Sequence, residues 1–278
     1  MAIAKAAAWQ VTLVCQFPLT PHHCSERSAV SRGTMDIEKI LENQRKWQTL
    51  PVDDEAAISA AAFEALSKCA DAVSVLSENL KDIGYRWVNV ERIPSVVLER
   101  NIQFIVSKTG LTVPKMLTSF WAIIGGVSFV DLENYWHVNF WQENKIIPKS
   151  GFADGLHIDP CNEEWVSFVC DDFNDWQENH GQTDSEGFIL SLSPDGYHKD
   201  GISGGEAYGV LAEPGWKPIW QNFEWTGVAR PVTALVTPPD FLSYLRTTIL
   251  ECAGFPSFLG APGFDPVKEK LLQRVPLF

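Results

Sequence analysis

The hydrophobic periodicity of this chain changes at Gly125 and Gly126, and this change constrains the fold more than any other feature. Before these glycines, apolar residues recur every three or four positions, as they do on the buried face of an α-helix. After them come short runs rich in Val, Phe and Ile, separated by turn-forming residues. Helical spacing returns over 240–252. The order predicts an α+β fold, with a small, mostly antiparallel sheet flanked by helices and preceded by a helical extension.

Four helices are expected before the change in periodicity. The first begins at Asp36, and the second runs from about Asp53 to Ile83, with acidic residues at its positive N-terminal end. A third covers 95–108, and a fourth begins at Pro114 and ends at the two glycines. The strands that follow are expected at 127–130, 165–170, 188–192 and 207–211.

Three parts of the chain are distinguished by composition and pattern. Residues 1–34 carry more basic than acidic side chains, and we interpret them as a leader that is disordered or precedes a true start at Met35. A secretory signal peptide is the alternative, but Gln10 and Thr12 interrupt its apolar run. We expect 35–110 to form the helical extension, packed on the core, and 111–278 to form the α+β domain.

Charge and the length of the apolar runs argue against two kinds of partner, nucleic acids and membranes. The chain of 278 residues is 45% hydrophobic, enough for a packed core, and holds 35 Asp and Glu against 22 Lys and Arg, a net charge of −13. This is the wrong sign for a phosphate backbone, so no nucleic acid is expected as a partner. No apolar run reaches the 18 or more residues of a membrane span, so no membrane contact is expected either.

The negative charge gathers between residues 151 and 186, where ten acidic residues occur with no Lys or Arg. One interpretation is a solvated face that keeps the protein soluble. The other is a surface that docks a basic protein, because aromatic side chains are interleaved with the acids. For this second interpretation the candidate partner-binding residues are Asp154, Asp159, Glu163, Glu164, Asp171, Asp172, Asp175 and Trp176.

The six cysteines are scattered, and none forms a C-x-x-C pair. Such spacing is typical of reduced, buried thiols in a cytoplasmic protein. His22, His23 and Cys24 lie together, but no second pair follows at zinc-finger spacing.

Two local patterns could carry chemistry. The string GISGG at 201–205 has the spelling of a serine-hydrolase elbow, but strand-like sequence follows it where the elbow needs a helix, so a glycine-rich connection explains it better. The pattern D-G-x-H-x-D occurs twice, at 154–159 and 195–200. Its side chains could bind a divalent metal, or could simply decorate two turns, and the alternative metal ligands are His157, Asp159, His198 and Asp200.

No other catalytic or cofactor motif is present in the sequence: there is no P-loop, G-x-G-x-x-G or H-E-x-x-H. We therefore expect no cofactor and no catalytic residue. A hydrolase or metal-dependent enzyme that uses the two D-G-x-H-x-D segments is the alternative.

Three segments, VPKMLTSFWAIIGGVSFV (113–130), LSPDGYHKDGISGGEAYGVLAEP (192–214) and PPDFLSYLRTTILECAGFP (238–256), together resemble a bacterial group related to the SUKH superfamily. That superfamily contains bacterial toxin-immunity proteins and the fungal Knr/Smi-type cell-wall regulators. The helix that ends in FWAIIGG and runs into a strand most resembles its core. The N-terminal helices and the tryptophan-rich stretch around Trp216, Trp220 and Trp225 have no counterpart in the compact superfamily pattern.

The resemblance implies a single α+β domain that binds protein partners. Its concrete version is an immunity protein that neutralises a basic toxin, such as a nuclease. The residues it marks are structural and lie at the helix-to-strand turn: Pro114, Phe120, Trp121, Gly125 and Gly126.

Overall fold

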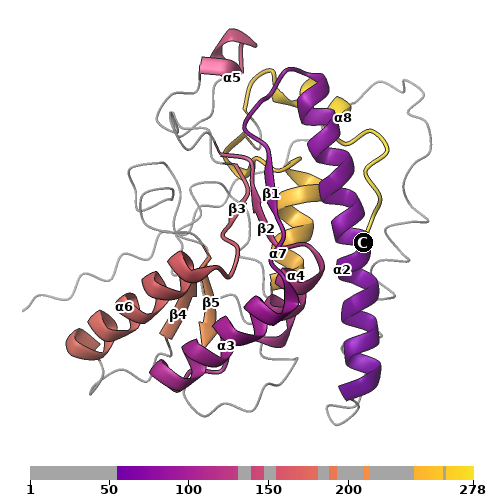
Figure 1. Cartoon of the computed structure of the whole chain (residues 1–278). Coiled ribbons are helices and arrows are strands. Elements are labelled where there is room, and N and C mark those ends of the chain that lie inside the picture. The colour runs from indigo at the N-terminus through magenta and orange to yellow at the C-terminus, as the bar shows by residue number, and fades with distance from the viewer. Residues whose placement is uncertain are drawn as a thin grey trace, which may run out of the picture.

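Helices make up most of the described chain and surround a small antiparallel sheet, so the protein has an α+β fold (Figure 1). The computed structural model describes residues 55–130, 139–146, 155–180, 188–192, 209–212, 241–258 and 261–278. The expected leader and the helix expected from Asp36 lie outside the described residues.

The longest helix, α2 (Glu55–Asp82), confirms the prediction from periodicity. Its buried stripe includes Leu66, Cys69, Leu76 and Leu80, each without measurable exposure. The helix ends at Gly84, whose φ of 88° lets the amides of residues 84 and 85 bond back to carbonyl groups of the last turn. In this way α2 forms one wall of the core and packs against α4 (Lys115–Ile123) and α8 (Phe264–Leu271).

The two helices that follow also lie where they are expected. Helix α3 (Ser95–Thr109) ends at Gly110, which has a φ of 71° and donates its amide to the Val106 carbonyl at 2.9 Å. Helix α4 begins one residue after Pro114, which is its N-cap residue and whose carbonyl accepts the Thr118 amide at 3.0 Å. Phe120 and Trp121 of α4 are buried, and the Trp121 indole donates to the Asp159 carbonyl at 2.9 Å.

The central sheet has the order β1-β2-β3, and both pairings are antiparallel. Its strands are β1 (Asn89–Glu91), β2 (Gly126–Ser128) and β3 (His157–Ile158). Strand β1 belongs to the segment that the sequence presents as a helical extension, so this segment also contributes an edge of the sheet. The buried residues of both parts form one hydrophobic cluster.

A second sheet pairs β4 (Phe188–Ser191) with β5 (Gly209–Ala212) in antiparallel register, at the positions expected for two of the strands. The strand expected at 165–170 is wrong, because these residues lie in helix α6 (Glu163–His180). The run Trp-Val-Ser-Phe-Val resembles a strand, but its buried members continue at helical spacing to Phe173. Asn162 caps the helix by accepting the Trp165 amide at 2.9 Å.

The C-terminal part closes the core with aromatic side chains. Helix α7 (Phe241–Arg246) confirms the helix expected over 240–252, and a π-helical segment, Thr247–Glu251, continues it. A short 3₁₀ turn, Pro256–Phe258, and the five-residue helix α5 (Asn139–Glu143) bring Phe255, Phe258 and Trp141 together, with ring centroids 4.7 to 5.7 Å apart. Tyr85 joins this cluster and donates its hydroxyl to the Phe129 carbonyl at 2.6 Å.

Candidate functional site: the exposed face of helix α6

Helix α6 is held by its apolar face, which leaves the opposite face to solvent. Trp165, Val166, Val169 and Phe173 are buried. The Trp165 ring meets Trp121 edge to face at 4.8 Å, and its indole donates to the Ser191 carbonyl of β4 at 3.0 Å. The helix is thus attached both to the core and to the second sheet. These contacts hold the backbone of α6 in place and so fix the positions of the side chains on its outer face.

Helices α3 and α6 run side by side in the same direction (Figure 1). Asn101 donates to the Cys161 carbonyl at 2.8 Å, and Arg100 pairs with Glu163 at 2.7 Å. Both side chains of this ion pair are more than half exposed, so it adds little to stability. The ion pair instead affects the local charge, because the Arg100 cation of α3 offsets the negative charge of Glu163.

The remaining outer acids of α6 form a stripe. Glu164, Asp171, Asp175 and Glu178 are all exposed, and their spacing of seven, four and three residues places them on one face of the helix. At a rise of about 1.5 Å per residue, the stripe is about 21 Å long. We refer to these four residues as the acidic stripe.

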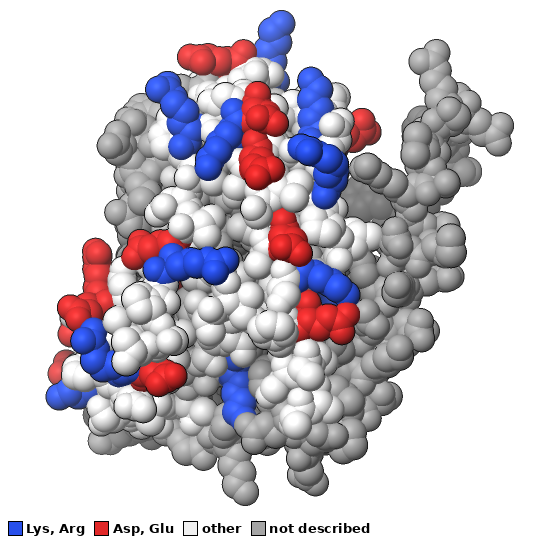
Figure 2. Space-filling view, turned by 45° about the vertical axis from the view of Figure 1, so that its right-hand side comes forward, with Lys and Arg blue, Asp and Glu red and all other residues white. Residues whose placement is uncertain are grey.

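Within the part of the chain that the structure describes, α6 holds all of the excess negative charge. It has six carboxylates and no Lys or Arg, whereas the other described residues have twelve Asp or Glu and twelve Lys or Arg. The face seen in Figure 2 illustrates this balance, since Lys and Arg lie interspersed with Asp and Glu over it. The charge that the sequence places between 151 and 186 therefore corresponds, where it is described, to one helix.

The structure separates the expected partner-binding residues into groups. Glu164, Asp171 and Asp175 lie in the acidic stripe, and Glu163 pairs with Arg100. Asp172 is half-buried, and Trp176 is half-buried against Phe173 and Phe188, with ring centroids 5.8 Å apart in both pairs. Asp154 lies outside the described residues. Glu178 extends the stripe by a turn and was missing from the set expected to bind a partner.

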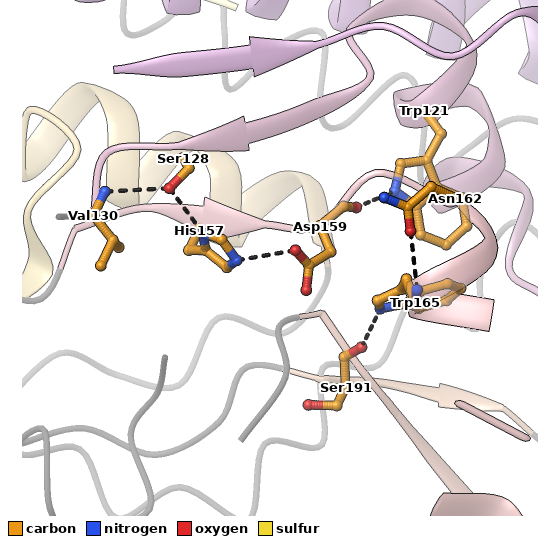
Figure 3. A network of polar contacts seen from close by, with 8 residues as sticks. All are labelled: Trp121, Ser128, Val130, His157, Asp159, Asn162, Trp165 and Ser191. Carbon is orange, nitrogen blue, oxygen red and sulfur yellow. Dashed lines mark hydrogen bonds and ion pairs between the residues drawn. The ribbon is translucent and has the colours of Figure 1, made fainter. Parts of the chain in front are cut away.

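Asp159 faces inward and belongs to a different arrangement, a chain of polar contacts between β2 and β3 (Figure 3). Its Oδ1 lies 3.1 Å from Nε2 of His157, and Nδ1 of His157 lies 2.9 Å from the Ser128 hydroxyl. The same hydroxyl accepts the Val130 amide at 3.3 Å. A neutral imidazole that carries its proton on Nε2 satisfies this chain, with Ser128 donating to Nδ1.

This polar chain links strand β2 to strand β3 in the interior of the protein. Ser128 and His157 are buried, with 6% and 4% of their surface exposed, so a substrate has no access to the hydroxyl. The main chain of Asp159 adds to the linkage, because its amide donates to the Leu192 carbonyl next to β4 at 2.8 Å. The network therefore joins the two sheets and α4.

The alternative metal site is only partly described. His157 and Asp159 do lie together, but both imidazole nitrogens already have hydrogen-bond partners, so ligation would break one of these bonds. His198 and Asp200, together with Ser203 of the GISGG string, lie outside the described residues. Among the residues that are described, no three His, Cys, Asp or Glu side chains gather as a metal site needs.

All four described cysteines are free thiols. Burial raises the pKa of Cys161 and of Cys252 to about 12 and also raises the pKa of Cys69. Burial and the neighbouring Asp171 raise the pKa of the half-buried Cys170. A raised pKa keeps each thiol protonated at neutral pH and therefore poorly nucleophilic.

Comparison with family models, with curated proteins and with solved structures finds no match to this chain. None of the helices in the described ranges is both long and apolar enough to span a bilayer.

Proposed function

We propose that this chain is a non-catalytic protein-binding domain that uses the acidic stripe of α6 to capture a basic protein. The observation that carries the proposal is the placement of charge: the exposed acids of α6 have no Lys or Arg on the same helix, whereas the rest of the described chain has equal numbers of acidic and basic side chains in total. A surface of this kind steers a positively charged partner and fixes its orientation.

The energetics of α6 support a role in binding. Asp171 and Asp175 are four residues apart, and Asp175 and Glu178 are three apart, so neighbouring like charges repel one another. Glu178 also stands in the last turn, at the negative end of the helix dipole. These charges weaken the isolated helix, and a cationic partner would relieve their repulsion.

The concrete version of the proposal is immunity against a basic toxin, such as a nuclease. It rests on the resemblance to the SUKH superfamily together with the charge of α6. A nuclease carries a cationic cleft for its substrate, and an anionic helix of about four turns is complementary to such a cleft. We place the protein in the cytoplasm, which the free, protonated thiols of the described cysteines support.

The test measures inhibition of purified cationic nuclease toxin domains by the full chain. We expect stoichiometric inhibition at low salt that weakens as ionic strength rises, because the contact is between exposed charges. The variant Asp171→Lys with Glu178→Lys should inhibit at least tenfold less well. Toxin domains that retain full activity at saturating concentrations of the chain would refute the immunity function.

A further inference from the structure

No described residue pairs with the outer edge of strand β1, and we propose that this edge pairs with β1 of a second copy of this chain. All three residues of the strand are exposed, including Val90 at 42%. The strand lies at the end of the β1-β2-β3 order, so only one of its two sides is paired within the sheet. This inference is independent of the acidic stripe.

The ladder on β2 shows which main-chain groups of β1 point outward. The Phe129 amide donates to the Leu156 carbonyl, so the odd-numbered residues of this strand direct their hydrogen bonds toward β3. Gly126 and Ser128 therefore direct theirs toward β1, where they pair with Glu91 and Asn89. Val90, opposite Val127, must direct its N–H and C=O away from β2.

The position of Glu91 supports the same direction. A Cβ built on Gly125 would stand 2.0 Å from the Glu91 carbonyl oxygen, so this oxygen points toward β2. In a strand, the next residue faces the other way. On that outer side, no hydrogen bond of the Val90 main chain is found among the described residues.

A second copy fits this edge through a two-fold axis at Val90. In antiparallel pairing, the two Val90 residues exchange both of their outward hydrogen bonds and their side chains meet. The same register places Asn89 of each copy opposite Glu91 of the other, which pairs an amide donor with a carboxylate acceptor. A slip of two residues in one direction would instead set the two Glu91 carboxylates opposite each other, so the charge favours the centred register.

The residues on either side of β1 would also pair with apolar residues of the second copy in this register. Trp87 and Ile93, both half-buried, would lie opposite one another across the axis. The two three-stranded sheets would then join into a single six-stranded sheet with closed two-fold symmetry. Because a short strand pair buries less than the roughly 1,200 Å² of a stable interface, we expect a weak dimer that forms at about 0.1 to 1 mM chain.

Sedimentation of the full chain up to about 1 mM tests the proposal, with Val90→Pro as the decisive variant. Proline removes an N–H that points outward and leaves the bonds to β2 intact, so the fold should survive. Losing two intermolecular hydrogen bonds should weaken the dimer about ten- to a hundredfold. Val90→Thr keeps the N–H and serves as the matched control.

Cysteine cross-linking tests the register directly. Paired residues at the axis have Cα atoms about 5.5 Å apart, within the range of a disulfide, so Val90→Cys should form a covalent dimer on mild oxidation. Asn89→Cys alone should not, whereas a mixture of Asn89→Cys and Glu91→Cys chains should cross-link. Wild-type chain is the control for the native thiols. A monomer at 1 mM, or equal cross-linking by Val90→Cys and Asn89→Cys, would overturn the proposal.

Discussion

Gly125 occupies the tightest point between β1 and β2, and its position explains why the helix before it must end there. Its φ of 93° is unfavourable for any residue with a side chain, and a Cβ would overlap the Glu91 carbonyl. Gly126 is equally restricted, since a Cβ there would lie 2.5 Å from Pro160. The two glycines therefore allow α4 to turn directly into the central strand.

Replacement of Gly125 by alanine should cost about 2 kcal/mol or more of the free energy of unfolding, because strain in φ and a steric clash with backbone act together. Gly110→Ala is the matched control. That glycine also has a positive φ, but a Cβ there meets nothing within 4 Å, so about 1 kcal/mol is expected. Urea unfolding of both variants measures the difference, and equal losses would contradict the predicted clash.

The buried thiols predict a loss of stability at alkaline pH. An unfolded cysteine has a pKa of about 8.5, whereas burial raises the pKa of Cys161 and Cys252 to about 12. Below pH 8.5 both states keep the proton; above it only the unfolded state releases it, so stability falls as pH rises toward 12. Each thiol contributes up to about 1.4 kcal/mol per pH unit.

Urea midpoints between pH 7 and pH 10 check this dependence. The slope above pH 8.5 should flatten in Cys161→Ala, whose thiol no longer titrates. An unchanged slope in this variant would assign the alkaline loss to other groups.

Helix α6 was not predictable from hydrophobic spacing alone, in contrast to the helices before it. The helices α2, α3 and α4 were predictable because each buries a stripe at 3.6-residue spacing. The apolar run at 165–170 is too short to distinguish strand from helix, and the distinguishing signal is the cap at Asn162 with the two acids after it. Strand β1 could not be predicted, since its three residues are too few to show a period-two pattern and none of them is buried.

The acidic stripe should make α6 less stable than its composition alone suggests. Glu178→Gln removes a negative charge from the C-terminal turn and from the neighbourhood of Asp175, so it should stabilise the protein by about 0.3 to 1 kcal/mol. Thermal unfolding measures this gain, and added salt should reduce the difference from wild type. A destabilised Glu178→Gln variant would show instead that this carboxylate supports the fold.

The acidic stripe of α6 is a surface that only the folded molecule reveals. The sequence located the acidic residues between 151 and 186 but could not show which of them face solvent. That depended on tertiary contacts: Asp159 turns inward to His157, Glu163 pairs with Arg100, and Trp176 packs on Phe188. Only the fold shows that the exposed remainder forms a stripe on one helix.

We propose that the location of this charge, and not its amount, determines partner binding. Isothermal titration with a cationic nuclease toxin domain tests it most directly, by comparing two variants of equal net charge. One reverses Asp171 and Glu178 on α6, and the other reverses Asp71 and Glu78, an exposed pair with the same seven-residue spacing on α2. We expect the α6 variant to bind at least ten- to a hundredfold more weakly than wild type, while the affinity of the α2 variant changes little. Equal weakening by the two variants would contradict it.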